Sequence, residues 1–276
     1  MPFVPGYEIA GEVDAVGAGV SGFKVGQRVA ALTLYGGYGE LLVRDAQHFT
    51  PIPDDVSDVD AAAVILNYVT AWQMIHRVAK VRPGQTALVT GAAGGVGTAA
   101  LQLLRIAGVK TYGAASAKKH ATVQVCGATP IDYRAGRLDL LVRAIEPMGV
   151  DHVFDAIGGA NTSLCISAAR RGSTVVGYGF MAVGGTLATL AMFANLFVGS
   201  RLRGRRGTFY GITLLYRKNP RLLLEDLPKI FALVANKAID PMISVIFPLL
   251  DARQAIELLA TGSVEGKIVL RNDAGA

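Results

Sequence analysis

Apolar and polar positions alternate along the first part of the chain. The stretches "GYEIAGEVDAVG" (6–17) and "QRVAAL" (27–32) follow this pattern, and glycines separate them. A period of two predicts short β-strands that each bury one face. The segment "GYGELLVRDAQHFTPIP" (37–53) predicts one more strand, followed by a loop.

From Asp60 the spacing becomes helical, within "DVDAAAVILNYVTAWQMIHRVA" (58–79), and then short β-branched runs alternate with helical ones. Strands are expected at Thr86–Thr90, Thr111–Ala115, Pro130–Asp132, His152–Ala156 and Thr174–Tyr178, and helices at Val96–Ile106, His120–Val125, Asp139–Ile145 and Asn161–Ala169. A strand in "RRGTFYGI" (205–212), a helix that opens at Pro220, and a final strand, helix and strand complete the pattern. Repeated βα units predict an α/β fold with a parallel sheet covered on both faces.

One uncharged segment, Gly172–Ser200, is apolar enough to suggest a membrane span. About 20 apolar residues are needed to cross a bilayer. Gly184 and Gly185 interrupt the segment, and the helix that remains, near 187–198, is too short to cross alone. We therefore expect a buried helix there rather than a membrane span.

The composition is that of a globular protein. Of the 276 residues, 51% are hydrophobic and 17% are charged, which predicts a large core in one or two domains. The two cysteines, Cys126 and Cys165, lie far apart and indicate neither a disulfide framework nor a metal cluster. The segment after Met1, "PFVPGYE", carries no secretory signal, so a cytoplasmic location is expected.

The net charge of +6 includes two basic clusters, "AKKH" (117–120) and "RLRGRRG" (201–207). A nucleic-acid surface would interleave such clusters with aromatic residues, so we do not expect nucleic-acid binding. The second cluster is interpreted equally well as a solvated surface. Together with the apolar helix it also allows a third function, contact with an anionic membrane surface, which we do not favour.

The stretch "VTGAAGGVG" (89–97) places glycines where a predicted strand turns into a predicted helix. Gly91 would allow the tight turn, Gly94 a close approach of a pyrophosphate, and Gly97 close packing of helix on strand. Backbone N–H groups at such a helix start attract phosphate. An ordinary βα turn is the alternative, but the strand, the helix and a second strand about 20 residues on favour a dinucleotide site. The candidate residues of this turn are Gly91, Ala92, Gly94, Gly95, Val96 and Gly97.

The end of the second βα strand distinguishes NADPH from NADH. NAD enzymes usually place an acid there to bind the ribose 2′-hydroxyl, but no acid occurs between Lys110 and Asp132. Ser116, Lys118 and Lys119 stand there instead and match a 2′-phosphate. NADP(H) is therefore the expected cofactor, unless these lysines are merely solvated.

Several motifs in order resemble the medium-chain dehydrogenase/reductase superfamily, and most of all its zinc-free quinone oxidoreductase, or zeta-crystallin-like, branch. They are "PGYEIAGEV", "GFKVGQRVAAL", "GGYGE", "LNYVTAWQM", "PGQTALVTGAAGGVG" and "GKIVL". The resemblance implies a Rossmann doubly wound sheet inserted in a GroES-like β domain. The GroES-like part is expected at 1–66 and 241–276, and the Rossmann NADP-binding domain at 67–240.

The resemblance also implies cofactor contacts. Lys119 and Tyr133 fall on positions that hold the 2′-phosphate, and Thr70 on one that lines the nicotinamide end. Backbone at Ala156, Ile157 and Gly158 and at Gly179 and Phe180 would line the same end. Relatives commonly dimerise, so a homodimer is expected.

Two departures from the family pattern matter. Zinc-dependent members read P-G-H-E, whereas this chain has Tyr7 at the histidine position, and a phenol is a poor zinc ligand at neutral pH. We therefore expect no zinc. The family normally has some fifty more residues before this motif, so the GroES-like domain is expected to be incomplete, with unpaired sheet edges.

Without a Lewis acid, hydride transfer suits an electrophilic acceptor such as a quinone or an α,β-unsaturated carbonyl. Tyr7, Tyr38 and Tyr68 are candidate donors to the developing oxyanion, with plain packing as the alternative for each. Apolar segments at 180–199 and 208–216 are expected either to form the substrate pocket wall or to be core or dimer surface. An NADPH-binding protein without turnover, and a zinc alcohol dehydrogenase, remain as alternative functions.

Overall fold

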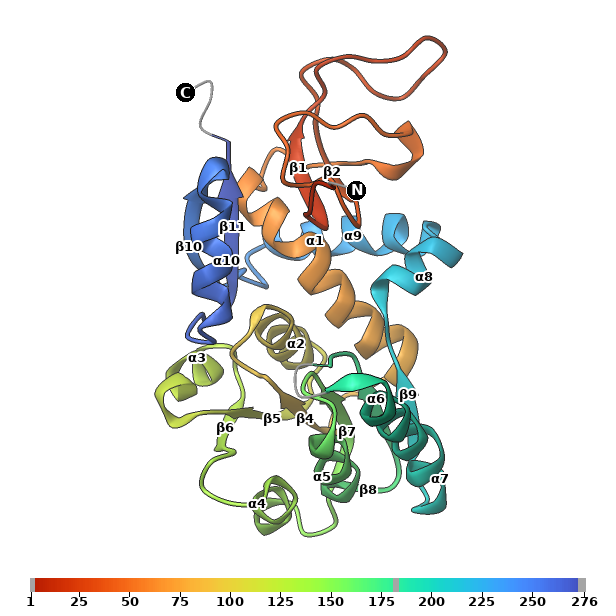
Figure 1. Ribbon diagram of the computed structural model, residues 1–276, viewed down its shortest axis with the longest axis vertical. Helices are drawn as coiled ribbons and strands as arrows, with labels where there is room; N and C mark the ends of the chain where they lie inside the picture. Colours follow the sequence, from red (N-terminus) through yellow and green to blue (C-terminus); the bar gives the residue numbers. More distant parts are fainter. Residues whose placement is uncertain (1–2, 181–183, 273–276) are drawn as a thin grey trace. The chain divides into compact units, whose positions relative to one another are not determined.

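The computed structural model describes residues 3–180 and 184–272. The chain divides into two compact units, and each is described by itself (Figure 1). Unit 1 comprises Met1–Thr70 and Ile212–Ala276, and unit 2 comprises Ala71–Gly211. Residues 212–240, which the sequence analysis assigned to the Rossmann domain, therefore group with unit 1.

Unit 2 contains a six-stranded sheet in which all neighbouring strands are parallel, in the order β6-β5-β4-β7-β8-β9. The strands are β4 (Thr86–Thr90), β5 (Lys110–Ala115), β6 (Thr129–Asp132), β7 (Val150–Asp155), β8 (Ala169–Gly177) and β9 (Arg206–Phe209). The order reverses between β4 and β7, as in a doubly wound fold, and this confirms the predicted fold class. Such a reversal opens a ligand-binding crevice at the carboxyl ends of the strands.

Helices cover both faces of this sheet (Figure 1). α2 (Gly95–Ile106) and α3 (His120–Val125) lie on one face, and α4 (Leu138–Ile145) and α5 (Ala160–Ala168) lie on the other. Every residue of β7 is buried, because this central strand is covered from both sides. Its Val153 and Phe154 side chains are inaccessible to solvent, and each such burial stabilises the fold by about 1.5–3 kcal/mol.

Unit 1 is built from smaller pieces. The strands β1 (Glu8–Glu12), β2 (Arg28–Leu32) and β3 (Thr50–Pro51) form an antiparallel sheet, and β10 (Ile243–Pro248) pairs in parallel with β11 (Lys267–Arg271). The helices are α1 (Asp58–Trp72), α8 (Ile212–Lys218), α9 (Arg221–Ala235) and α10 (Ala252–Ala260). The π-helical segment η2 (Gln73–Ala79) continues α1 into unit 2.

The strand expected early in 37–53 is wrong. Only β3 forms in this segment, after the short 3-10 helix η1 (Ala46–His48). Leu41 and Val43 are strongly exposed, and no described strand pairs with their backbone. A period of two makes a strand only where a partner strand accepts its hydrogen bonds, and here none does.

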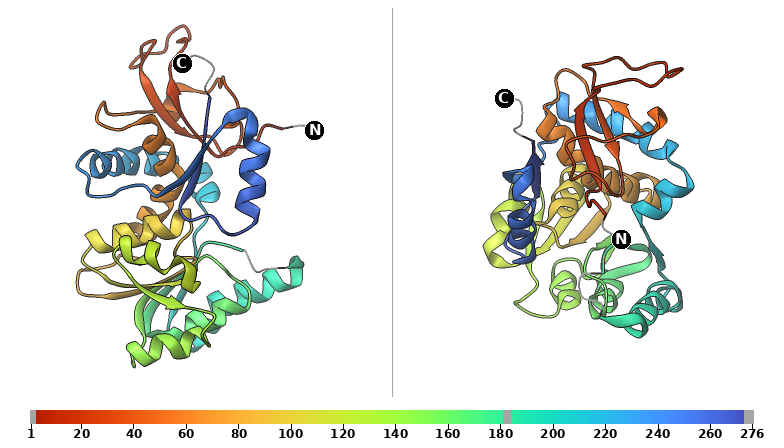
Figure 2. Two further views of the ribbon diagram at one scale, coloured as in Figure 1. Left: turned by 90° about the vertical axis from the view of Figure 1, so that its left-hand side faces the viewer. Right: turned by 45° about the horizontal axis from the view of Figure 1, so that its top comes forward.

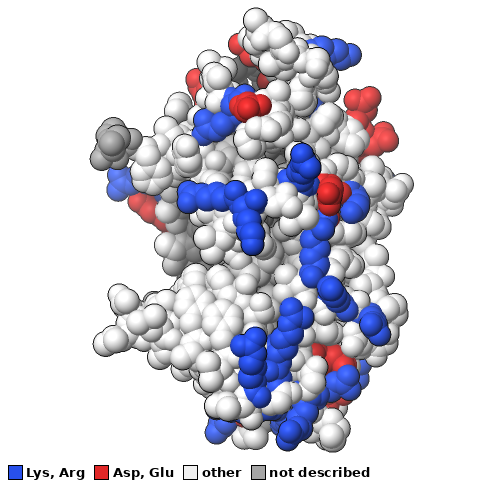
Figure 3. Space-filling model, turned by 90° about the vertical axis from the view of Figure 1, so that its right-hand side faces the viewer, with Lys and Arg blue, Asp and Glu red and all other residues white. Residues whose placement is uncertain are grey.

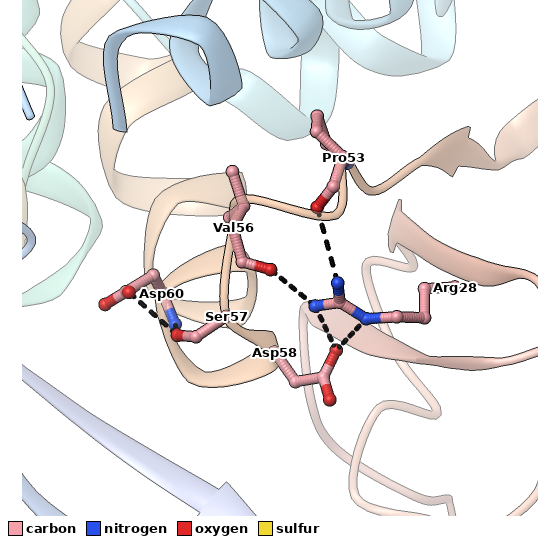
Figure 4. A network of polar contacts seen from close by, with 6 residues as sticks. All are labelled: Arg28, Pro53, Val56, Ser57, Asp58 and Asp60. Carbon is pink, nitrogen blue, oxygen red and sulfur yellow. Dashed lines mark hydrogen bonds and ion pairs between the residues drawn. The ribbon is translucent and has the colours of Figure 1, made fainter. Parts of the chain in front are cut away.

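A local network anchors the start of α1 (Figure 4). The Ser57 hydroxyl accepts the Asp60 N–H at 3.1 Å and so caps the helix start, and it donates to the Asp60 carboxylate at 2.7 Å. Arg28 of β2 donates to the carbonyl of Val56 at 2.5 Å and pairs with Asp58 at 2.6 Å. The helix start and the antiparallel sheet are thereby connected within unit 1.

The helix expected near 187–198 forms, but its predicted burial is wrong. α6 (Gly185–Ala194) continues through η4 (Asn195–Gly199) into α7 (Ser200–Leu202), and only Met192, Leu196 and Ser200 are buried along this run. Leu187 is 83% exposed. The run lies along one side of unit 2, with its amino-terminal end projecting from the unit (Figure 2). Burial was wrongly predicted because an apolar sequence does not reveal whether a second layer covers it.

Candidate functional site

The glycine turn joins β4 to α2 at the carboxyl edge of the unit 2 sheet. Gly91 has a φ of +62°, a conformation that favours glycine, and its carbonyl accepts the Gly94 N–H at 3.0 Å. A Cβ at Gly97 would lie 2.2 Å from the Gly91 carbonyl oxygen, so only glycine lets α2 pack this closely. The first N–H groups of a helix have no intrahelical partner. These N–H groups are available to an anionic group, and binding of a pyrophosphate by the turn stays a prediction.

The loops after β7 and β8 approach this turn at Ala156. A Cβ at Gly91 would lie 3.2 Å from the Ala156 Cβ, and a Cβ at Gly179 would lie 2.0 Å from the Ala156 carbonyl oxygen. Gly158 and Gly159 have φ values of +73° and +58°. Three of the predicted cofactor segments thus converge within unit 2. Phe180, which follows Gly179, contacts the rings of Phe193 and Phe209.

The residues predicted to bind the 2′-phosphate follow the ends of two neighbouring strands. β5 and β6 pair in parallel with Ala115 opposite Asp132, so Ser116 and Tyr133 follow adjacent strand ends. Ser116 precedes the 3-10 helix η3 (Ala117–Lys119), which contains Lys119. The guanidinium of Arg134 lies 5.7 Å from the centre of the Tyr133 ring.

The sequence analysis missed Arg134, although it directly follows Tyr133 and adds a positive charge at this edge. The adjacent ends of β5 and β6 thus carry one hydroxyl, one phenol and several cations, which are groups that can bind a phosphate monoester. The signal in the sequence was the run "IDYR" (131–134), of which only the tyrosine was used.

The remaining predicted residues belong to unit 1. Tyr7 precedes β1 and its side chain is 46% exposed. The Tyr68 side chain is buried, and its hydroxyl donates to the Asp240 carbonyl at 3.5 Å. Thr70 is buried in the last turn of α1. Tyr38 lies on the loop before η1, and its side chain is 36% exposed.

Glu8, the acid that follows Tyr7, has a structural role. One carboxylate oxygen accepts the Leu66 N–H at 2.5 Å, and the other pairs with Lys267 of β11. The residue therefore ties β1 to α1 and to the last strand within unit 1.

A buried carboxylate that sequence reasoning missed lies under the glycine turn. Asp155, the last residue of β7, is fully buried and accepts hydrogen bonds from Thr90, Asn161 and Thr162 side chains. Burial, followed by the charge of Asp155, raises the pKa values of Cys165 and Tyr178, so both stay protonated at neutral pH. In the sequence Asp155 is only one residue inside the predicted strand His152–Ala156, and its partners lie up to 65 residues away.

Arginine residues gather at the opposite, amino-terminal end of β8 and β9. Burial, and then the charges of Arg143, Arg203 and Arg171, lower the pKa of Arg205. Arg205 donates to the backbone carbonyls of Ala169 and Arg203. Figure 3 shows Lys and Arg side chains gathered on this side of the molecule, with an uncharged lobe next to them in unit 2.

Neither a metal cluster nor a membrane span is found among the described residues. In the ranges 3–180 and 184–272, no three His, Cys, Asp or Glu side chains come close enough to hold a metal ion. Within the same ranges, every helix is too short or too polar to cross a bilayer. The predicted pocket wall at 180–199 includes Met181–Val183, which lie outside the described residues.

Two protein-family descriptions match the chain. "Alcohol dehydrogenase GroES-like domain" matches residues 1–54, and "Zinc-binding dehydrogenase" matches residues 126–270. The two matches fall in the regions that the resemblance had assigned to the GroES-like domain and, for the most part, to the Rossmann domain.

Individual relatives agree with this. The synaptic vesicle membrane protein VAT-1 homolog of Rattus norvegicus is 42% identical over 182 residues, which are 65% of this chain and 45% of the relative. The human VAT-1 homolog-like protein is 30% identical over 98% of this chain and 67% of its own length. The Escherichia coli quinone oxidoreductase complexed with NADPH has a TM-score of 0.85 at 26% identity, over 98% of this chain and 82% of that one. The chain thus spans less than half the length of the first of these relatives.

Proposed function

This chain belongs to the medium-chain dehydrogenase/reductase superfamily, and from that premise we propose that it is an NADPH-dependent oxidoreductase. Its proposed acceptor is a quinone or an α,β-unsaturated carbonyl compound. The observation that carries the proposal is the glycine turn of unit 2, with the basic ends of the next two strands of the same sheet, β5 and β6. The E. coli quinone oxidoreductase, which is similar in fold, is described as complexed with NADPH.

In the proposed complex, different residues of unit 2 bind different parts of NADPH. The turn from Gly91 to Gly97 would receive the pyrophosphate, since it offers backbone donors and no side chain in the way. Ser116, Lys119 and Tyr133 would hold the 2′-phosphate, with Arg134 beside them. Ala156–Gly158, Gly179 and Phe180 would line the nicotinamide end. When bound, NADPH supplies the hydride.

We propose that the reaction does not use zinc. The residue in the P-G-x-E motif is Tyr7, and the described part of the chain brings no three metal-binding side chains together. The residues present therefore do not fit a catalytic zinc ion, which takes three protein ligands. An acceptor that is already electrophilic needs orientation and a hydrogen-bond donor, not a Lewis acid.

We propose Tyr7 and Tyr68 as oxyanion donors, and Tyr7 is the stronger of these two candidates. Its side chain is exposed, whereas the Tyr68 side chain is buried and its hydroxyl already donates to a backbone carbonyl. Tyr7→Phe is therefore expected to lower kcat with little effect on folding, and Tyr68→Phe to lower stability more than kcat. Equal kcat values for Tyr7→Phe and the wild type would exclude Tyr7 as a donor.

The deciding experiment measures NADPH and NADH oxidation against a panel of quinones and enones. We expect a clear preference for NADPH, and we expect Lys119→Glu to abolish this preference. Lys24→Glu, the same charge change in an exposed loop of unit 1, is the control and should leave the preference intact. Equal rates with both cofactors in the wild type would exclude the 2′-phosphate assignment.

NADPH binding without turnover is the alternative outcome. Calorimetry would then detect heat of association with NADPH while no acceptor in the panel oxidises it. We further expect a cytoplasmic homodimer, as the resemblance implies, and sedimentation velocity measures the oligomeric state.

Contact with an anionic membrane surface is a second candidate function, and one observation favours it. The exposed apolar run of α6 ends at the arginine cluster of Arg201, Arg203 and Arg205, and several relatives are named as vesicle membrane proteins. Such a surface should bind vesicles of phosphatidylcholine and phosphatidylserine in co-sedimentation, and salt should weaken the binding. Arg201→Glu with Arg203→Glu should release the protein, and Lys24→Glu should not.

A further inference from the structure

Asp155 is held by hydrogen bonds alone. One oxygen accepts from the Thr90 hydroxyl at 3.0 Å, the Asn161 amide at 2.7 Å, and the backbone N–H groups of Ile157 at 3.1 Å and Gly158 at 3.3 Å. The other oxygen accepts from the Thr162 hydroxyl at 2.9 Å. Among the ion pairs of the described residues, none includes this carboxylate. An ionised group buried in this way is stable only if its donors stay in place.

Thr90 uses its hydroxyl in both directions. It donates to Asp155 and accepts the Ala156 N–H at 3.0 Å. Thr90 is the last residue before Gly91, so it belongs to the strand that delivers the glycine turn. Three successive N–H groups after β7, those of Ala156, Ile157 and Gly158, are therefore bound by Thr90 and Asp155 together.

This network lies between the glycine turn, which is proposed to bind the pyrophosphate of NADPH, and the Ala156–Gly158 loop, which is proposed to line its nicotinamide end. Parallel pairing places Val89 opposite Phe154, so Thr90 and Asp155 follow at the same level. Above them, Ala156 is packed between Gly91 and Gly179: a Cβ at Gly179 would clash with the Ala156 carbonyl oxygen, and a Cβ at Gly91 would crowd the Ala156 Cβ. A shift of the loop after β7 would thus be transmitted to the glycine turn and to the loop after β8.

We propose that Thr90 and Asp155 are positioning residues that set the separation between the glycine turn and the Ala156–Gly158 loop, and thereby the placement of the nicotinamide ring. This inference rests on the proposed function. Neither side chain needs to touch the cofactor, because both act through backbone groups of the two loops. A carboxylate suits the role since it only accepts, whereas an asparagine would turn an amide donor toward other donors.

Thr90→Val is the sharpest test, because it removes the hydroxyl and keeps the shape of the side chain. Thr111→Val is the matched control: Thr111 is also buried on a strand of this sheet, and its hydroxyl donates at 3.1 Å to the Val109 carbonyl. Thr90→Ser keeps the hydroxyl and should restore wild-type behaviour. Thermal unfolding of all three variants shows whether they fold equally well.

In steady-state kinetics with NADPH and a benzoquinone, Thr90→Val should lower kcat about tenfold to a hundredfold, the usual cost of misplacing a reacting group. Its affinity for adenosine 2′,5′-bisphosphate, which lacks the nicotinamide, should equal that of the wild type. Thr111→Val should leave both quantities unchanged. Equal losses of kcat in Thr90→Val and Thr111→Val would show a purely structural role and overturn the inference.

Hydrogen exchange of the Ile157 and Gly158 amides tests the network without any ligand. These amides should exchange faster in Thr90→Val and in Asp155→Asn than in the wild type and in Thr111→Val. Unchanged exchange would overturn the inference even in a protein that oxidises NADPH. Wild-type protein that neither binds nor oxidises NADPH would instead overturn the proposed function, whatever the exchange rates are.

Discussion

Two carboxylates, Asp155 of unit 2 and Glu8 of unit 1, are stabilised in different ways. In unit 2, Asp155 is fully buried and is satisfied by neutral donors from the sheet and from the loop that follows it. In unit 1, Glu8 is satisfied by one backbone N–H and by the cation of Lys267. Neutral donors on neighbouring backbone fix a local geometry, whereas an ion pair ties together segments that are distant in the chain. Asp155 thus fixes the arrangement of one loop, and Glu8 holds separate segments of unit 1 together.

The sheets of the two units also differ, in how completely their strands are buried. The central strands of unit 2 are buried on both faces, whereas β10 of unit 1 alternates between partly buried and exposed residues. A strand covered on both sides tolerates few changes of volume, because its neighbours cannot relax into solvent. The tightest packing and the proposed cofactor site therefore belong to the same unit.

The largest difference between the two units is expected for glycine substitutions. Gly97→Ala places a carbon 2.2 Å from the Gly91 carbonyl oxygen, so the turn must shift, and we expect NADPH affinity to fall by about a hundredfold or more. Gly11→Ala in β1 meets no atom within 4 Å and should bind and unfold like the wild type. Fluorescence titration and thermal unfolding check both variants. Unchanged affinity in Gly97→Ala would mean that the turn does not contact the cofactor.

Loss of the cation in unit 1 should have the next largest effect. Lys267→Met leaves the mostly buried Glu8 without its partner, and we expect the free energy of unfolding to fall by about 2–3 kcal/mol. The exposed pair of Arg253 and Glu257 on α10 is the control, and Arg253→Met should cost less than about 0.5 kcal/mol. Urea unfolding measures both changes. Similar small losses in the two variants would show that the Glu8 pair does not stabilise unit 1.

The smallest effect on stability is expected from the hydrogen bond between Tyr112 and Glu146 in unit 2. The buried Tyr112 donates to Glu146 at 2.6 Å, and this bond, followed by the one from Lys110, lowers the pKa of Glu146. Tyr112→Phe should cost about 1 kcal/mol at neutral pH. The pKa of Glu146 is lower in the folded state than in the unfolded state. The extra stability of the wild type over Tyr112→Phe should therefore be lost as the pH falls from the unfolded-state pKa through the folded-state pKa.

Unfolding free energies of Tyr112→Phe and the wild type, measured between pH 7 and pH 3, check this sign. The two curves should converge at the acidic end. A difference that stays constant with pH would mean that the tyrosine acts by packing alone.

The sequence by itself determined the local structure of unit 2. The β4 strand, the α3 helix and the glycine turn lie where the pattern of residues predicted them, to within one residue. These features depend on neighbours along the chain: a period of side chains, a residue that tolerates positive φ, and a helix that starts after it. For this reason the amino-acid sequence alone is enough to recognise Gly91 and Gly97.

Only the tertiary structure decided which surfaces are covered and which distant groups meet. The apolar helix α6 is exposed, and the strand expected near Leu41 does not form, because burial and strand pairing require a second element. Asp155 and Thr90 are 65 residues apart, and only the parallel pairing of β7 with β4 brings them together. Periodicity describes one segment at a time, whereas packing and hydrogen bonding between segments depend on the whole fold.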